Sequence, residues 1–415
     1  MDITGTPVDE SFDFSIMPST SDTVVDDFFG WVGTLRRERP VAPVRFHGGI
    51  GYLLTRYQDV WEGFRAEGAF NLREFHKVAT FPTMGENIMG MEGEEHRLHR
   101  QLVSLPFRPS TVNNFRQETL RTMCDEFIDE FADDGEAELM AQLARRLPVR
   151  AIARLLGLPE HPQLEEWAIA FITYQWDPVG SLAAAEAFTG FLREVVEERR
   201  KAPSDDLISQ LLGTSVEGVE LTDETLLTFV RLLFPTGADT TYLAVGAMLY
   251  ALARDYDTAD ELRSSEPARV RFVEETLRWE SPVGAMPRVC TEDTEIAGER
   301  IPAGSMVLLG VTAANRDPAV FADPDRFNPK RDAARHLSFG LGRHFCLGAP
   351  LARAEMLAAL EAVVDRFASL EVVKEPRMLG ALMRGPDEVN VRFERRRCSG
   401  DVQRGDHRGH HLDGP

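Results

Sequence analysis

Apolar residues recur at three- and four-residue spacing along most of the chain. From about residue 92 to residue 254 this spacing predicts an almost wholly helical stretch, interrupted at Pro106, Pro109, Pro159, Pro178 and Pro203. A further helix is expected from about residue 269 to 280, and helices resume near residue 349. The pattern therefore predicts a mainly α fold.

Short strands are expected where this periodicity is lost. Residues 43–46 and 52–55 flank a Gly-rich turn at 47–51, which predicts a hairpin, and residues 57–65 then look helical. Six prolines between residues 282 and 329 punctuate a mixed region of short strands and turns. The expected fold class is mainly α with a small β region.

The chain divides into three parts by pattern. Residues 1–40 lack strong periodicity and are expected to form an irregular lead-in. Residues 41–393 show neither a repeat nor a linker and are expected to form one domain. Residues 394–415 are polar and rich in Gly, Arg and His, so a disordered tail is expected.

One long helix stands out within the helical stretch. It is expected to run from residue 221 to about residue 254, with Thr222 as its capping residue. Pro235-Thr236-Gly237 places a helix breaker and a poor helix former in its middle. A kink is expected there, and such breaks are often placed where the backbone serves a function.

Composition narrows the range of functions. Hydrophobic residues make up 43% and charged residues 27% of the 415 residues, which is ordinary for a globular protein. The net charge of −21 disfavours a role in binding nucleic acid. No apolar run reaches the length of a membrane span and the first residues do not resemble a signal peptide, so a cytoplasmic protein that does not bind membranes is expected.

The four cysteines show no CxxC pattern, which suits a reducing compartment and argues against structural zinc. Cys346 lies in a loop with three glycines, Phe339-Gly340-Leu341-Gly342-Arg343-His344-Phe345-Cys346-Leu347-Gly348, just before a predicted helix. A helix N-terminus, neighbouring amides and Arg343 would favour a thiolate, which is what a metal ligand needs. A lone cysteine is more often an inert buried thiol, but the whole loop pattern should arise by chance in only on the order of a few chains per million.

This decapeptide resembles the haem-binding loop of the cytochromes P-450 at all its defining positions. The resemblance runs from about residue 40 to residue 393 and implies the mostly helical, triangular fold of that family. It implies haem b as cofactor, with the thiolate of Cys346 as the ligand that pushes electron density onto iron. It further implies that Phe339, Gly340 and Gly348 belong to the haem-binding loop and that His344 is a donor to a haem propionate.

Two further elements fit the same resemblance. His96 and Arg100 are four residues apart on one helical face, where a solvated charged surface is the simpler interpretation. The resemblance implies that both hold haem propionates, together with Arg288.

Glu275 and Arg278 could likewise be only a surface ion pair. The resemblance implies instead that they lock the fold near the haem with Arg326, for which Arg331 is a possible substitute.

The middle of the long helix reads Thr236-Gly237-Ala238-Asp239-Thr240-Thr241 and resembles the family's oxygen-activation segment. Gly237 would make room for dioxygen, Thr240 would hydrogen-bond it, and Asp239 would relay protons from water. Alone, Thr240 could equally be an ordinary hydroxyl that bonds to its own helix. Thr236, where the family usually has Ala or Gly, and Pro235 depart from the pattern and leave the shape of the oxygen pocket open.

The position of these motifs implies a largely apolar substrate pocket. Some of its members could simply pack the core, as Met and Phe usually do. The expected lining residues are Phe75, Phe81, Met84, Ile88, Met89, Leu233, Val283, Met286, Leu382 and Met383.

The resemblance implies a monooxygenase that inserts one oxygen atom of dioxygen into a hydrophobic small molecule, such as a terpenoid, a steroid or an aromatic compound. Electrons would come from an iron-sulfur ferredoxin, docked on a basic patch despite the overall charge. The patch would comprise Arg97, Arg100, Arg108, Arg343 and Arg353. The alternatives are a peroxygenase driven by hydrogen peroxide, a non-catalytic haem sensor, and a helical protein without cofactor.

Overall fold

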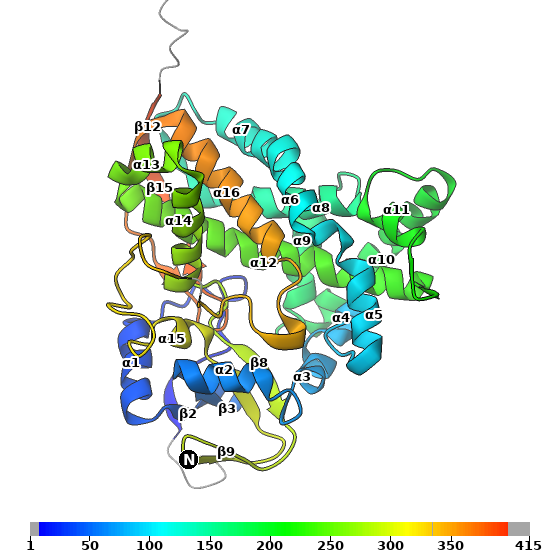
Figure 1. The fold of residues 1–415 in the computed structure, drawn as a ribbon, viewed down its shortest axis with the longest axis vertical. Helices are drawn as coiled ribbons and strands as arrows, with labels where there is room; N and C mark the ends of the chain where they lie inside the picture. Colours follow the sequence, from blue (N-terminus) through cyan, green and yellow to red (C-terminus); the bar gives the residue numbers. More distant parts are fainter. Residues whose placement is uncertain (1–7, 334, 397–415) are drawn as a thin grey trace, which may run out of the picture.

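The computed structural model describes residues 8–333 and 335–396, and most of them are helical (Figure 1). The mainly α prediction is confirmed, and the hairpin and several helix ends lie where the sequence places them. The helices are α1 Phe28–Glu38, α2 Tyr57–Arg65, α3 Leu72–Ala79, α4 Phe81–Met84, α5 Gly93–Val103, α6 Pro109–Phe115, α7 Arg121–Asp129, α8 Arg146–Leu156, α9 Leu164–Ile172, α10 Pro178–Lys201, α11 Leu207–Leu212, α12 Asp223–Arg254, α13 Ala259–Ser264, α14 Glu266–Trp279, α15 Val311–Asn315 and α16 Ala349–Arg366.

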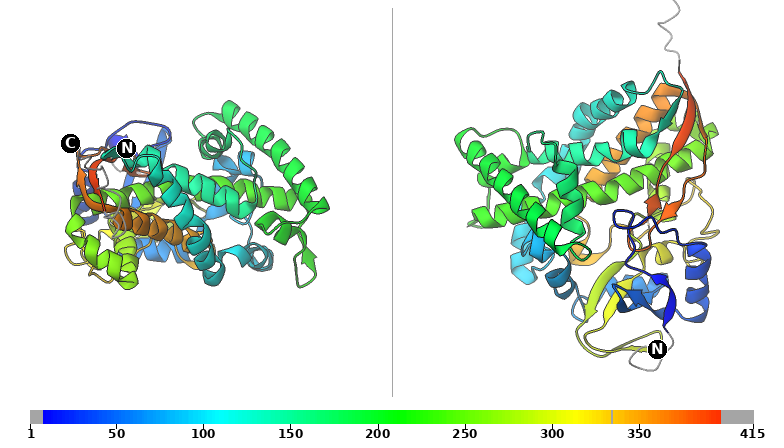
Figure 2. Two further views of the ribbon diagram at one scale, coloured as in Figure 1. Left: turned by 90° about the horizontal axis from the view of Figure 1, so that it is seen from above. Right: turned by 180° about the vertical axis from the view of Figure 1, so that it is seen from behind.

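A six-stranded sheet lies at one end of the helical body (Figures 1 and 2). Its strands, in spatial order, are β1 Asp9–Asp13, β2 Val41–Phe46, β3 Gly49–Leu54, β11 Met306–Leu309, β8 Met286–Cys290 and β4 Phe70–Asn71. The β2–β3 hairpin turns through His47 and Gly48, both at positive φ, which is the geometry of a tight hairpin turn. The β11–β8 pair carries residue 288 to the edge of the cavity described below.

Four smaller sheets complete the β structure of the described residues. One has three strands, β12 Phe367–Val372, β15 Asn390–Arg395 and β5 Glu136–Glu138. The others are two-stranded: β6 Ser215–Val216 with β7 Val219–Glu220, β9 Thr294–Ile296 with β10 Glu299–Ile301, and β13 Met378–Leu379 with β14 Gly385–Pro386.

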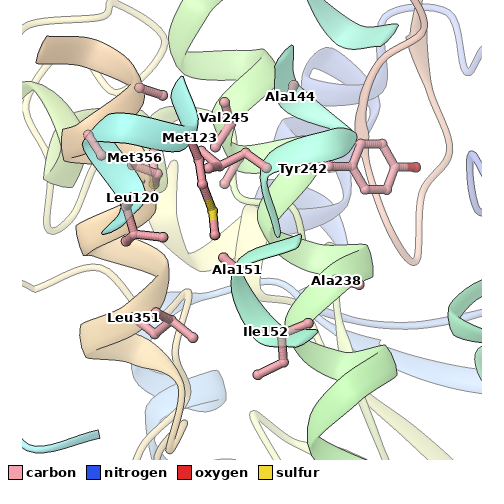
Figure 3. Close-up of a cluster of buried hydrophobic side chains, with 14 of the residues drawn as sticks. Leu120, Met123, Ala144, Ala151, Ile152, Ala238, Tyr242, Val245, Leu351 and Met356 are labelled. Atoms are coloured by element: carbon pink, nitrogen blue, oxygen red, sulfur yellow. The ribbon is translucent and has the colours of Figure 1, made fainter. Parts of the chain in front are cut away.

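Helix α12 forms the centre of the helical core. Its N-cap is Thr222, whose hydroxyl accepts a hydrogen bond from the amide of Thr225 as the sequence predicts. The helix is buried along most of its length and packs on α8, α9 and α16. Figure 3 shows Ile152 of α8, Val245 of α12 and Leu351 of α16 in this core, with Met123 of α7 between them.

Pro235 does not end α12. The hydrogen-bonded helix continues without interruption from residue 223 to residue 254, although Pro235 can donate no backbone hydrogen bond. One turn of the helix gains a side-chain contact at this point, because Thr236 Oγ1 donates to the carbonyl of Leu232 at 2.6 Å. Helix α12 is thus one continuous helix despite Pro235 and Thr236.

The prediction of an irregular lead-in over residues 1–40 is wrong for two segments. β1 pairs with β2, and α1 begins after Asp27, whose carboxylate accepts a hydrogen bond from the amide of Gly30. Arg36 ties α1 to the body by donating to the carbonyls of Thr55, Ala313 and Arg316. Two glycines within α1 weaken its periodicity, so the pattern alone did not indicate a helix.

The predicted tail begins too early by two residues, because β15 continues to Arg395 against β12 and β5. The amide of Arg396 also donates to the carbonyl of Arg366, and the rest of that prediction falls on residues 397–415, which lie outside the described residues. Among the residues that are described, no helix has the length and apolar character needed to cross a bilayer.

Candidate functional site

A single cavity of about 300 Å³ lies between the cysteine loop and α12. Cys346, Gly348 and Leu351 line it from the loop and the start of α16, and Gly237 and Thr240 line it from α12. The remaining lining comes mainly from apolar side chains of α3, α4, α9 and β8. The thiol and the oxygen-activation segment, far apart in sequence, therefore face one space.

The cysteine loop takes its shape from its glycines. Gly340 and Gly342 have φ of +69° and +76°, a conformation that L side chains rarely adopt. The amide of Cys346 donates to the carbonyl of Phe339 at 3.0 Å, which closes the loop on itself. Arg353 of α16 lies over the Phe339 ring at 4.4 Å. These contacts hold the thiol at the cavity wall.

Burial dominates the electrostatics of Cys346 and raises the pKa of its thiol. The amides of Gly348 and Ala349 and the guanidinium of Arg100 act in the opposite direction. Arg343, which the sequence suggested as the source of positive potential, instead pairs with Glu67 at 3.5 Å. The protein alone therefore does not secure a thiolate, and a metal ion that displaces the proton is needed for that.

Four cationic or imidazole groups gather at one side of the cavity. Arg100, Arg288 and His344 line it, and the His96 ring lies 4.8 Å from the His344 ring. Among the described residues neither Arg100 nor Arg288 has an ion-pair partner, although Arg288 is only 7% exposed. Nε2 of His96 is buried and has no hydrogen-bond partner within the part of the chain that the structure describes.

The pKa values of this group show the same unbalanced charge. Burial lowers the pKa of Arg288 to about 10 and that of His96 to about 4, with Arg100 adding to the effect on His96. Burial and the neighbouring cations lower the pKa of His344 to about 3. Four donor groups without an anionic partner among the described residues fit a dianionic group, as the two propionates of haem would be. The four predicted propionate donors are thus brought together.

On α12, Thr240 is placed as predicted but its hydroxyl is shared. It lines the cavity and donates to the carbonyl of Thr236 at 3.1 Å. Gly237 also lines the cavity, and a Cβ at this position would meet the Ile152 side chain at 3.1 Å. Gly237 therefore permits close packing of α12 on α8 as well as an open cavity wall.

Asp239 does not line the large cavity. It lies in a second, smaller cavity of about 40 Å³, whose other lining residues include Ser19, Arg145, Glu165 and Tyr242. Burial raises the pKa of Asp239 to about 7, although the nearby Arg145 opposes the shift. At neutral pH this carboxyl can both take up and release a proton.

The predicted Glu-Arg-Arg cluster is present, with one correction. Glu275 and Arg278 are fully buried and joined by two hydrogen bonds of 2.8 Å. The third member is Arg331, whose Nε lies 3.3 Å from Glu275. Arg326, the predicted member, contributes only its backbone carbonyl, which accepts from Arg278 and Arg331. The sequence offered both arginines, and only the path of the loop brings the side chain of Arg331 back to Glu275.

The predicted pocket residues divide into two groups. The cavity is lined by Phe75, Met84, Ile88, Met89, Leu233 and Met286. The prediction is wrong for Phe81, Val283, Leu382 and Met383, which do not line it. Phe81 stacks on His76 instead. Val283 and Met383 pair through their backbones, and Leu382 packs in a separate core cluster beneath the sheet.

Sequence reasoning missed several polar groups that the fold places here. His76, Thr80 and the buried Glu355 line the large cavity, and Arg145 and Glu165 line the small one with Asp239. His76 and Thr80 are four residues apart, which places both on one face of a helix and was a usable signal. No such pattern marks the other three residues.

The predicted basic patch is largely neutralised. Arg97 pairs with Glu94 and Glu217, Arg343 with Glu67, and Arg353 with Glu274. Arg108 is exposed and has no ion-pair partner among residues 8–333 and 335–396. Phe345, beside the cysteine, is also 40% exposed.

Comparison with known proteins points to one family. The model of the cytochrome P450 family matches residues 160–265 and 269–393. The chain is 37% identical to the erythromycin C-12 hydroxylase of Saccharopolyspora erythraea over 84% of its own length and 89% of that protein. It is 31% identical to a steroid C26-monooxygenase of Rhodococcus jostii over 84% of its own length and 77% of that protein. The cytochrome P450 PksS of Bacillus subtilis superposes with a TM-score of 0.82 at 29% identity, covering 91% of this chain and 99% of that one.

Proposed function

Because the chain belongs to the cytochrome P450 family, whose members are haem-thiolate monooxygenases with haem b, we propose that it oxygenates a hydrophobic small molecule using electrons from a ferredoxin. The observation that carries this proposal is the shared cavity, which brings Cys346 together with Thr240. Its apolar lining from α3, α4 and β8 suits a substrate of low polarity. Relatives named as an erythromycin hydroxylase and a steroid monooxygenase support this class.

The chain's residues hold the haem at two places. Cys346 would be the iron ligand, and His96, Arg100, Arg288 and His344 would hold the propionates. When bound, the haem supplies the chemistry of dioxygen activation, and its thiolate ligand favours cleavage of the O–O bond.

In our proposal, the protons for this chemistry come from the small cavity that Asp239 lines. Asp239 faces the small cavity and Thr240, the next residue, faces the large one. The carboxyl of Asp239 would take up a proton beside Arg145 and Glu165, and its pKa of about 7 suits both steps of the transfer. To present its one hydroxyl proton to dioxygen in the large cavity, Thr240 would release the hydrogen bond that it donates to the carbonyl of Thr236.

The ferredoxin would dock on the cysteine side of the molecule. Of the five arginines of the predicted patch, Arg108 is the exposed one without an ion-pair partner among the described residues, and the exposed Phe345 lies next to Cys346 in sequence. An acidic partner would gain most from Arg108, since Arg97, Arg343 and Arg353 already have acidic partners. Reversal of this charge, Arg108→Glu, should slow the association with ferredoxin and leave substrate binding unchanged.

The test begins with the spectrum of the reduced, carbon-monoxide-bound protein. A Soret band without the red shift of thiolate ligation would contradict the assignment of Cys346. The reaction is then tested with Thr240→Ala, which should spend electrons from the ferredoxin system without matching product formation. Turnover driven by hydrogen peroxide in the same variant is the internal control, because added peroxide bypasses proton delivery. Unchanged coupling would instead favour a peroxygenase.

A further inference from the structure

The wall formed by α3 and α4 carries a polar pair among apolar side chains. These elements line the cavity with Leu72, Phe75 and Met84, and with His76 and Thr80. Nδ1 of His76 lies 2.7 Å from Oγ1 of Thr80, one helical turn further along. In a mainly apolar pocket, a few placed polar groups determine the orientation of the ligand.

The threonine hydroxyl is placed to favour one tautomer of the ring. Among the described residues, the partner of Thr80 Oγ1 is His76 Nδ1, and the hydroxyl can donate its proton to that nitrogen. Burial, with the nearby charges of Arg288 and His344, lowers the pKa of His76 to about 3 and keeps the ring neutral. A neutral ring that accepts at Nδ1 carries its proton on Nε2 and is a donor there.

The Nε2–H group is directed to whatever the cavity holds. No described residue accepts a hydrogen bond from it, and the His76 ring lines the cavity. It also differs from Nε2 of His96, which is enclosed by protein without a partner. A donor in such surroundings is costly to leave unpaired, so it discriminates between ligands with and without an acceptor.

The ring is held in place by aromatic contacts. Phe81 stacks on it at a centroid distance of 6.0 Å and an interplanar angle of 21°, and Phe75 meets it edge-on at 5.3 Å. Phe81 therefore contributes to the site by supporting His76, although it does not line the cavity. A rigid donor loses little freedom on binding and gains more selectivity than a mobile one.

We infer that His76 is a specificity-determining residue, whose Nε2–H donates a hydrogen bond to a carbonyl oxygen of an otherwise hydrophobic substrate. The inference rests on the proposed function and narrows its substrate class to ketones, esters or lactones. A haem propionate is the competing acceptor. The substrate is favoured because His96, Arg100, Arg288 and His344 already supply donors for two carboxylates, and Thr80 shares the apolar wall.

The test uses a pair of probes that differ by one oxygen. Cyclododecanone and cyclododecane are titrated into the haem-loaded protein, and the low-spin to high-spin shift gives a dissociation constant for each. The protein should favour the ketone, and His76→Phe should reduce that preference about tenfold, the order of one buried hydrogen bond. Phenylalanine keeps the ring contacts with Phe75 and Phe81, so the variant should still fold and bind the hydrocarbon.

Three further variants make the result specific. His76→Gln should restore part of the preference, because its amide N–H can take the place of Nε2–H. Thr80→Val should lower the preference by a smaller factor, since the tautomer is then no longer fixed. Lys77→Gln is the matched control, because Lys77 is exposed and pairs with Glu74 at 2.6 Å. It should leave the ratio unchanged.

Several outcomes would overturn the inference. One is a ketone preference that is equal in the original protein and in His76→Phe. A second is the absence of any ketone preference in the original protein, which includes the case in which neither probe shifts the spectrum. Another is an equal weakening of both probes together with faster transfer of haem to apomyoglobin, which would assign His76 to a propionate. None of these readings needs electron transfer. A protein that binds both probes without ever oxidising them would contradict the proposed function instead.

Discussion

Two walls of the same cavity are built in different ways. The cysteine wall consists of residues 339–348 and the start of α16, a single continuous segment. The substrate wall is assembled from α3, α4, α9, α12 and β8, which are far apart in the sequence. On the cysteine wall the conformation of the backbone places the functional atom. On the substrate wall the packing of helices decides which side chains are exposed to the cavity.

This difference explains why chemistry and specificity can vary independently. The cysteine wall depends on glycines at positive φ, which few substitutions preserve, and on the backbone hydrogen bond between Cys346 and Phe339. The substrate wall is made of Met, Phe, Leu and Ile side chains that can be exchanged with little effect on the backbone. Variants of the two walls should therefore fail in different ways.

The largest effect is expected on the cysteine wall. Cys346→Ser should remove the red-shifted Soret band of the reduced carbon-monoxide complex and lower monooxygenation by at least about a thousandfold, since the thiolate no longer assists O–O cleavage. Cys290→Ser is the control, because that thiol is buried near the carbonyl of Glu292 and lies outside the cavity. A Cys346→Ser protein that kept the red shift would contradict the proposal that Cys346 of the cysteine wall is the iron ligand.

The next largest effect concerns Asp239, which lies on α12 but faces the small cavity behind the substrate wall. Asp239→Asn should lower turnover with ferredoxin by about 10- to 100-fold, because an amide cannot release a proton to Thr240. Turnover of the original protein should depend on a group with a pKa of about 7, and Asp239→Asn should remove that dependence. A pH profile of kcat that is the same in both proteins would contradict the role of Asp239.

The same pKa shift makes the free energy of unfolding depend on pH. The pKa of Asp239 is raised in the folded state, so the folded protein binds more protons than the unfolded chain between about pH 4 and pH 7. The free energy of unfolding should fall as pH rises through this window, by up to ~4 kcal/mol from this group. Asp239→Asn should lack this contribution, which denaturant titrations at pH 5 and pH 7.5 can measure.

The next prediction distinguishes the contributions of the Arg331 and Arg326 side chains to stability. Arg331→Ala should lower the free energy of unfolding by about 2 kcal/mol, because it removes a partner of the fully buried Glu275. Arg326→Ala should change it by less than about 0.5 kcal/mol, since only the backbone of Arg326 is used. Equal losses in the two variants would show that the side chain of Arg326 also supports this wall.

The smallest effect is expected on the substrate wall. Met84→Ala should weaken the binding of cyclododecane about fivefold, because part of the apolar contact is lost. Met383→Ala should change it by less than about twofold, since Met383 is not at the cavity. Spin-state titration measures both. A similar loss in the two variants would mean that the wall extends further than the lining residues indicate.

The sequence predicts the cysteine wall better than the substrate wall for a physical reason. A ten-residue loop contains all the information that places Cys346, and the i, i+4 spacing of His96 and Arg100 needs only one helix. Whether Phe81 or His76 faces the cavity depends instead on how α3 packs on β8 and how α4 packs on α10 and α12. The Arg326 error is of the same kind, because the path of a loop without periodicity decides which of two nearby arginines turns back.

The position of Asp239 could be predicted only in part. Its place in the motif was clear, but the small cavity beside it is formed with Arg145 and Glu165, which come from other segments. The helices themselves were predictable because their periodicity and caps are local, as Thr222 shows. Helix α1 was missed because it is short, contains glycines and is stabilised mainly by its contacts with the rest of the fold.

Those contacts of α1 set a limit on how the chain can be shortened for laboratory use. A gene trimmed to begin at residue 41, where the pattern alone places the start of the domain, would delete the guanidinium of Arg36 and leave three carbonyl oxygens without it. It would also uncover the core surface on which Phe28 and Val32 rest. Such a product should express poorly and tend to aggregate, whereas one that begins at residue 8 retains the whole N-terminal brace.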